Sequence, residues 1–325
     1  MKKRSAINKM CLAMLSVTIV LSGCGKADTF MKPYDAISQQ SEFSFVGSAQ
    51  QGRASAFAAE LCVANENVIP ASSPITAESA SVFCMDDKTV LYAKNIHQRM
   101  HPASLTKLMT VLLALESGKL DDMVTVTEEA MISESGATIC YLKPGDTLTL
   151  RQLVNCCLVK SGNDAASAIA VYLGGSLEGF NEMMNTRAKE LGATGTNYAN
   201  PHGLTQDDHY TTAYDIYLVL NEAMKYDEFL SSINLASYEL NYTDAEGNPK
   251  TNTFESTNRF ISGKADAPDG ITVIGGKTGT TNAAGSCLAL ASRSSSGKVY
   301  ISVIMKADGS DLLFEEMKSL LSLEN

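Results

Sequence analysis

The sequence predicts an α+β protein in which an antiparallel β-sheet is flanked by terminal helices and carries an inserted helical lobe. Strand-like apolar runs lie toward both ends of the chain, helical patterns fill the middle, and an amphipathic helix closes it. The 325 residues are 45% hydrophobic and 19% charged, which suffices for a substantial core. This composition excludes a wholly disordered or collagen-like chain.

The individual elements follow from local patterns in chain order. Two apolar runs surround Asp86-Asp87-Lys88 within residues 81–95, which predicts a hairpin. The segments that follow have the spacing of apolar residues typical of helices. After residue 235 the pattern becomes typical of β-strands. The predicted helices span residues 105–115, 150–159, 165–173, 176–191, 211–224 and 311–323. The predicted later strands span residues 237–242, 249–254, 271–277, 285–291 and 299–305.

The first 23 residues are predicted to be a targeting segment. Met1-Lys2-Lys3-Arg4 is positively charged, and the apolar stretch of residues 11–21 is too short for a membrane span of about 20 residues. Leu21-Ser22-Gly23-Cys24 resembles the bacterial lipobox, which implies cleavage before Cys24 and a lipid on its sulfur. The alternative is an ordinary signal peptide with a chance cysteine. We expect an extracytoplasmic protein that is lipid-anchored to the cell membrane.

Residues 24–54 are rich in Ser, Gln, Gly and Ala and are predicted to be a flexible tether, so residues 55–325 form the folded domain. The chain has 26 Lys and Arg against 36 Asp and Glu, a net charge of −10. This acidity and the lack of a basic run argue against a nucleic-acid partner.

Eight cysteines occur in the chain, of which Cys11 lies in the targeting segment and Cys24 in the lipobox. The other six have irregular spacing without a C-x-x-C pair or a Cys/His ligand set. We expect them to be mainly small buried hydrophobic residues, and one disulfide stays open as an alternative. They are Cys62, Cys84, Cys140, Cys156, Cys157 and Cys287.

Three short motifs carry the chemistry, in this order: Ser104-Leu105-Thr106-Lys107, Ser161-Gly162-Asn163 and Lys277-Thr278-Gly279-Thr280. Each motif alone is weak evidence, because Ser295-Ser296-Gly297-Lys298 repeats the first pattern. Taken alone, Ser104 is more readily a helix cap than a nucleophile. The joint pattern is specific, since Ser104 is expected to open a helix, Ser161 to lie between helices and Lys277 to end a strand.

This set resembles the superfamily of penicillin-binding proteins and serine β-lactamases. The motif surroundings, together with residues 141–146 and Asn200-Pro201-His202-Gly203-Leu204, look like the D-Ala-D-Ala carboxypeptidases among the low-molecular-mass penicillin-binding proteins. The resemblance covers residues 75–305 and implies the DD-peptidase fold. Many relatives append a β domain and an amphipathic membrane helix. This chain stops soon after the sheet, and the lipid on Cys24 is expected to replace that anchor.

The chemistry of the first motif can be argued from its residue types. Lys107 lies one helical turn beyond Ser104 on the same face and can reach its hydroxyl. To accept that proton, the lysine must be neutral. Lowering its pKa from about 10.4 to about 7 corresponds to roughly 4 kcal/mol, which burial and a nearby cation can supply.

The other roles are implied by the resemblance. Lys277 is the neighbouring cation, Ser161 relays a proton to the leaving amine, and Asn163 holds Lys107 and a substrate amide. Thr278 and Thr280 accept the terminal carboxylate.

The resemblance also assigns the backbone around the scissile bond. The backbone N–H groups of Ser104 and Thr280 form the oxyanion hole. Gly279 lets the substrate lie against the strand as an added β-strand. Arg259 resembles a family arginine near the carboxylate site.

The sequence therefore predicts a serine D-Ala-D-Ala carboxypeptidase that acts on peptidoglycan stem peptides and binds β-lactams covalently, with no cofactor. A class A β-lactamase needs a glutamate beyond the middle motif, but no carboxylate occurs between Glu190 and Asp207. A penicillin-sensing module without turnover is the third alternative, and transfer to an amine acceptor also stays open. His202 and His209 lack metal-ligand spacing, so no metal is expected.

Overall fold

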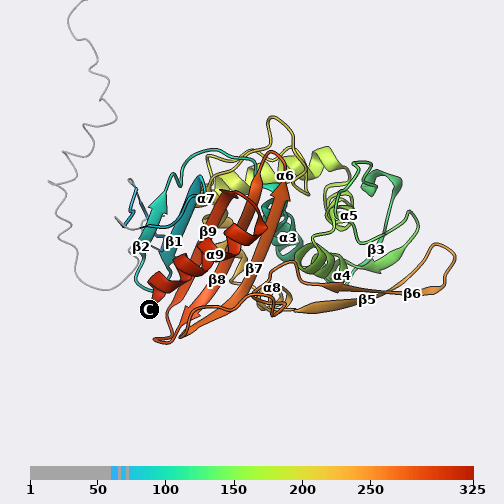
Figure 1. Cartoon of the computed structure of the whole chain (residues 1–325). Coiled ribbons are helices and arrows are strands. Elements are labelled where there is room, and N and C mark those ends of the chain that lie inside the picture. Colours follow the sequence, from blue (N-terminus) through green and yellow to red (C-terminus); the bar gives the residue numbers. More distant parts are fainter. Residues whose placement is uncertain (1–59, 65–66, 71–72) are drawn as a thin grey trace, which may run out of the picture. The chain divides into compact units, whose positions relative to one another are not determined.

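Two antiparallel sheets and the helices around them make up the part of the chain that the structure describes, a computed structural model (Figure 1). This part covers residues 60–64, 67–70 and 73–325. The targeting segment, the lipobox and the tether predicted for residues 1–54 lie outside the described residues.

The larger sheet has five strands in the order β2-β1-β9-β8-β7. Its N-terminal hairpin pairs with a C-terminal strand, with Ser79 opposite Met305 and Cys84 opposite Tyr300. This confirms the prediction that strands from both ends share one sheet. The strands are β1 Ser79–Cys84, β2 Thr89–Lys94, β7 Ile271–Thr281, β8 Gly285–Ser294 and β9 Val299–Ala307.

Both faces of this sheet are buried. Successive side chains of a strand point to opposite faces, and nearly all residues of β8 and β9 are buried. In β8 and β9, Leu288 and Ile304 pack with the C-terminal helix α9, Ser310–Leu321, in one apolar cluster. Their neighbours Ala289 and Val303 belong to the other cluster, together with the helical lobe. Figure 1 shows α9 lying across the sheet on the face opposite α3 and α7. Among described residues 60–64, 67–70 and 73–78, no helix precedes β1, so α9 alone supplies the predicted terminal helix there.

The helices of the inserted lobe lie close to their predicted positions. Residues 107–115 of α3 are all buried, so this helix forms the centre of the lobe rather than an amphipathic surface helix. A capping box between Thr149 and Gln152 begins α4. The helices are α3 Lys107–Glu116, α4 Leu150–Asn155, α5 Asn163–Gly174, α6 Leu177–Glu190, α7 Ala213–Ala223 and α8 Asp227–Ile233.

The predicted helix over residues 150–159 changes character before it ends. After Asn155 the chain continues as a π-helix over Cys156–Lys160, and Ser161 then takes a left-handed conformation with φ 68°. A π turn is wider than an α turn, and the pattern of apolar residues does not distinguish the two. Gly162 follows at a point where a Cβ atom would lie 2.4 Å from the Cys140 sulfur.

A second sheet with the order β3-β4-β5-β6 belongs to the lobe. We predicted a single antiparallel sheet with a helical insertion, whereas the predicted strands of residues 237–242 and 249–254 belong to this second sheet. The short strands and α8 were not expected either, because runs of three to seven residues carry too little periodicity. The four strands are β3 Met123–Thr125, β4 Thr147–Thr149, β5 Ser237–Thr243 and β6 Pro249–Glu255.

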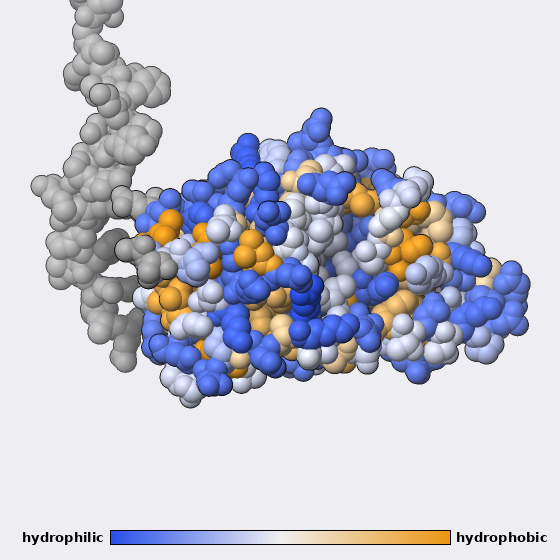
Figure 2. All heavy atoms as spheres, in the orientation of Figure 1, coloured by the Kyte–Doolittle hydropathy of each residue, from blue (hydrophilic) through white to orange (hydrophobic). Residues whose placement is uncertain are grey.

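The six cysteines in the described residues are all free and buried, which confirms their role as small hydrophobic residues. No helix in the described part of the chain is both long and apolar enough to cross a membrane. Figure 2 shows that hydrophilic residues cover much of one face of the molecule, with apolar residues in separate patches.

Candidate active site

Ser104 lies in a 3-10 turn, Ala103–Thr106, that leads directly into α3. The α-helix therefore begins three residues after the serine, at Lys107. The Ser104 side chain caps neither element, since the cap positions are Pro102 and Thr106. The interpretation of Ser104 as a plain helix cap is wrong, and its hydroxyl is available to Lys107.

Three oxygen atoms surround the amine of Lys107, which is fully buried. Its Nζ lies 3.0 Å from Ser104 Oγ, 2.6 Å from Asn163 Oδ1 and 2.7 Å from the backbone oxygen of His202. The amide and carbonyl oxygens can only accept hydrogen bonds. A neutral amine gives them its two N–H groups, so its lone pair faces the Ser104 hydroxyl. Burial lowers the pKa of Lys107 to about 8, which makes this neutral form accessible.

A second buried lysine completes the cluster from the sheet. Lys277 Nζ donates to Ser161 Oγ at 2.9 Å and to the backbone oxygen of Thr278 at 2.8 Å. Burial and then the charge of Lys107 lower the pKa of Lys277 well below its usual value. A proton on Lys107 thus disfavours a proton on Lys277. We expected β7 to end at Lys277, but it continues to Thr281 and extends alongside the cluster.

The contact between β7 and the nucleophile depends on Gly279. A Cβ atom at this position would lie 2.9 Å from the backbone nitrogen of Ser104. We expected Gly279 to let the substrate lie against the strand. In the structure, the lack of a side chain at Gly279 lets β7 itself pack against the turn that contains Ser104. Because β7 is an edge strand, its outer backbone groups can pair with an extended peptide.

Thr278 and Arg259 differ in how they relate to this cluster. The Thr278 hydroxyl donates to Thr257 Oγ1 at 2.6 Å. Thr257, two residues before Arg259, therefore contacts the Lys277–Thr280 motif. Arg259 itself pairs with Asp311 at 2.7 Å and lies over the Phe314 ring on α9. The structure therefore joins Arg259 to α9 rather than to the carboxylate site, because an acidic and an aromatic partner lie on that helix.

Sequence reasoning missed a chain of hydrogen bonds behind the nucleophile. The backbone N–H of Ala199 donates to His209 Nδ1 at 2.9 Å, so Nε2 carries the ring proton and donates to Thr106 Oγ1 at 2.7 Å. The Thr106 hydroxyl donates in turn to the Ala103 carbonyl at 2.8 Å. Burial lowers the pKa of His209 to about 3, so the ring stays neutral.

This chain holds a strained residue directly before the nucleophile. Ala103 has φ 48°, a left-handed conformation that is costly for a residue with a side chain. Gly203 packs against it, since a Cβ atom there would lie 1.9 Å from the Ala103 oxygen. No local sequence pattern indicates that His209 supports the turn of Ser104. The one available signal is its position a few residues after the 200–204 motif.

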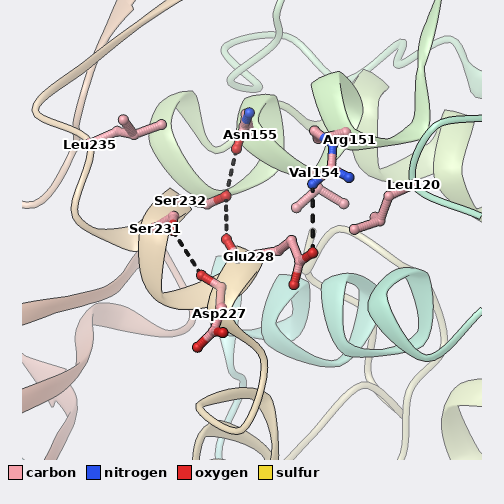
Figure 3. A pocket seen from close by; sticks show the side chains of 9 residues that line it. All are labelled: Leu120, Arg151, Val154, Asn155, Asp227, Glu228, Ser231, Ser232 and Leu235. Atoms are coloured by element: carbon pink, nitrogen blue, oxygen red, sulfur yellow. Dashed lines mark hydrogen bonds and ion pairs between the residues drawn. The ribbon is translucent and has the colours of Figure 1, made fainter. Parts of the chain in front are cut away.

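A cleft of about 590 Å³ opens above the cluster. Ser104, Asn163 and Thr280 line it, together with residues 134–138 and 203–205. Another hollow, of about 320 Å³, lies between α4 and α8 (Figure 3). None of the motif residues lines it, and its Arg151 and Glu228 face each other with 4.0 Å between Nη1 and Oε1. Because Ser104 and Asn163 line the larger cleft, we take that cleft as the candidate active site.

Two histidines near the cluster have hydrogen-bond partners within the protein. His202 and His209 direct ring nitrogens toward backbone and hydroxyl groups of their own loop and of Thr106. Within the described part of the chain, no three His, Cys, Asp or Glu side chains are grouped to hold a metal ion.

Comparison with known proteins gives one family match. The model of the Peptidase S11 family, D-alanyl-D-alanine carboxypeptidase, matches residues 66–309. The chain is 37% identical to the D-alanyl-D-alanine carboxypeptidase DacF of Bacillus subtilis over 65% of this chain and 53% of DacF. It is 34% identical to DacD of Escherichia coli over 79% of this chain and 66% of DacD. The chain thus spans roughly half to two thirds of these curated relatives.

Solved structures show the same fold. The Streptomyces K15 DD-transpeptidase superposes with a TM-score of 0.72 at 26% identity, over 78% of this chain and 98% of that one. The D-alanyl-D-alanine carboxypeptidase DacD of Francisella tularensis gives a TM-score of 0.68 at 27% identity, over 80% and 73%. Both likenesses confirm the predicted DD-peptidase fold.

Proposed function

Because this chain belongs to the D-alanyl-D-alanine carboxypeptidase family, we propose that it is a serine-type carboxypeptidase that removes the terminal D-Ala from peptidoglycan stem peptides. One observation carries the proposal. The Lys107 amine lies between the Ser104 hydroxyl and two oxygens that only accept hydrogen bonds. This arrangement turns a buried lysine into a base for one particular hydroxyl.

The first step forms the acyl-enzyme. Lys107 takes the Ser104 proton while Oγ attacks the carbonyl carbon between the two D-alanines. The backbone N–H groups of Ser104 and Thr280 stabilise the negative oxygen, which the close packing at Gly279 brings within reach. The proton returns to the leaving D-Ala amine through Ser161, which Lys277 holds at 2.9 Å. Water then releases the shortened peptide.

Substrate orientation follows from the edge strand. The terminal carboxylate lies toward Lys277 and the hydroxyls of Thr278 and Thr280, and the peptide pairs with β7 as an antiparallel strand. A β-lactam presents an amide and a carboxylate at comparable positions and acylates the same serine.

The experiment is mass spectrometry of a peptide that ends in Lys-D-Ala-D-Ala after incubation with the protein. We expect the loss of one alanine with wild type and none with Ser104→Ala. An intact peptide with a correctly folded wild-type protein would refute the proposal.

Transfer to an amine is a second candidate, favoured by the fold similarity to a protein described as a DD-transpeptidase. The same acyl-enzyme reacts with an amine in place of water. Adding a glycine acceptor to the mass-spectrometric assay distinguishes the two, since transfer adds the acceptor mass to the shortened peptide. A product that never carries glycine would exclude transfer to this acceptor.

The lifetime of the β-lactam adduct separates this enzyme from a β-lactamase. Residues 191–206 contain no Glu or Asp to activate water, and the opened drug stays beside the acyl bond. We expect release about a thousandfold slower than with a dedicated base, or about 4 kcal/mol of barrier. The adduct mass is followed after excess benzylpenicillin is removed. Complete loss within seconds would favour a β-lactamase.

We also propose that a lipid on Cys24 anchors the mature protein outside the cell membrane. Leu21-Ser22-Gly23-Cys24, after a short apolar segment, supports this. Cys24→Ser should leave the precursor without lipid and uncleaved, as shown by the mass of the N-terminal peptide. Lipid-free mature wild-type protein in the medium would contradict the proposal.

A further inference from the structure

The cleft extends from Ser104 in one direction along β7. Its walls include Thr280 and residues 281–283 but neither Lys277 nor Thr278. The proposed function places the terminal carboxylate at Lys277, Thr278 and Thr280 and the peptide antiparallel to β7, so the part of the cleft beyond Thr280, at residues 281–283, receives the opposite end of the substrate. It therefore holds the residues that precede the scissile bond, and the inference below rests on that function.

One charged side chain lines this part of the cleft. Glu134 is the single ionisable residue among the lining residues and lies on the segment 134–138, whose Thr138 carbonyl accepts from the Asn163 backbone. Within the described residues, its carboxylate makes no hydrogen bond or ion pair with another side chain. The side chain is exposed and free to meet a ligand.

The other walls of the same space are partly apolar. Ala137, Leu204 and Ala283 contribute small or aliphatic side chains to the same lining as Ser104 and Glu134. An aliphatic stem that ends in an ammonium group matches such a path, because the stem packs on apolar groups while the charge stays near water and the carboxylate.

We propose that Glu134 is a specificity-determining residue that selects stem peptides whose side chain before D-Ala-D-Ala carries a free ammonium group. Acylation of that amine removes the charge and adds bulk, so substituted stems are poorer substrates. The enzyme then acts preferentially on stem peptides that have not been joined through this amine.

The test compares two peptides, Nα-acetyl-Lys-D-Ala-D-Ala with a free ε-amine and the same peptide with an acetylated ε-amine. For wild type we expect kcat/KM to be about threefold higher for the free amine, the size typical of a solvent-accessible ion pair. Glu134→Gln should bring this ratio to about one, and Glu134→Lys should invert it. Glu246→Gln, at an exposed acid in the turn between β5 and β6, should keep the wild-type ratio.

Salt gives an independent readout. Raising the ionic strength to 0.5 M should shrink the wild-type ratio, since an exposed pair is screened, and leave that of Glu134→Gln unchanged. A wild-type ratio of one, or a ratio that Glu134→Gln and Glu134→Lys both retain, overturns the inference. Failure of wild type to cleave either peptide would instead refute the proposed function.

Discussion

The same tetrapeptide pattern occurs twice in this chain and behaves differently in its two surroundings. In Ser104-Leu105-Thr106-Lys107 the lysine is fully buried and burial lowers its pKa to about 8. In Ser295-Ser296-Gly297-Lys298, between β8 and β9, the lysine is only partly buried and pairs with Asp87 at 2.6 Å. That carboxylate raises the pKa of Lys298, so this lysine keeps its proton.

The difference has a structural cause. The first pattern lies in a helical turn, which places residues three apart on one face, inside a lobe that excludes water. The second lies in a turn between strands, where Gly297 has φ 89° and Ser295 and Ser296 are exposed. A lysine becomes a base through burial and acceptor-only partners, and the spacing alone provides neither.

The largest expected effect separates the two serines. Ser104→Ala should abolish covalent labelling by a fluorescent penicillin, because it removes the hydroxyl that Lys107 contacts at 3.0 Å. Ser295→Ala should label like wild type. Labelling is measured by in-gel fluorescence, and a signal that persists in Ser104→Ala but disappears in Ser295→Ala would reverse the assignment.

The pH dependence of stability should distinguish the two lysines. Lys107 has a pKa of about 8 in the fold and 10.5 when unfolded, so the unfolded chain binds more protons between these values. The contribution of Lys107 to the free energy of unfolding should therefore rise by about 3 kcal/mol from pH 8 to pH 10.5 and be lost as pH falls through 8. Denaturant unfolding of wild type and Lys107→Met measures this difference.

The control for this experiment is Lys298→Met. Because Asp87 raises the pKa of Lys298, any change has the opposite sign and should be small for an exposed pair. Equal pH dependence in the two methionine variants would show that burial does not set the pKa of Lys107.

The rate of acylation should follow the protonation of Lys107. With a pKa of about 8, Lys107 is about half neutral at pH 8 and about one-hundredth neutral at pH 6, so acylation by a β-lactam should be about fiftyfold slower at pH 6 than at pH 8. Above pH 8 the rate should level off. Stopped-flow measurement checks this, and Lys298→Met should show the same profile. A flat profile from pH 6 to 8 would argue against a lysine base.

The smallest expected effect concerns the hydrogen bonds from His209 through Thr106 to Ala103, which hold the turn of Ser104. His209→Gln keeps a donor near the position of Nε2 and should acylate within about twofold of wild type. His209→Asn keeps an acceptor for the Ala199 N–H but loses the donor to Thr106, and should acylate about tenfold more slowly. Melting temperatures are measured alongside. Equal rates in both variants would remove His209 from the positioning of Ser104.

Local patterns alone predicted much of the fold. The hairpin before Asn95, the helices of the lobe and α9 follow from periodicities of two and 3.6, which each segment carries within itself. The shared sheet and the buried cysteines follow from hydrophobicity along the chain. The order of the three motifs marked Ser104, Ser161 and Lys277. In the structure Ser104 contacts Lys107, Ser161 contacts Lys277, and the two lysines lie close enough for the charge of Lys107 to lower the pKa of Lys277.

Other features depend on partners far away in the chain, and only the tertiary structure decided them. The π turn that sets Ser161 in a left-handed conformation has the same apolar pattern as an α turn. Arg259 meets Asp311 through a contact across 52 residues, and His209 reaches Thr106 across 103. The free energy of such a contact depends on how deeply it is buried and on which partner residue the fold brings to it. Neither can be read from the residues adjacent in sequence.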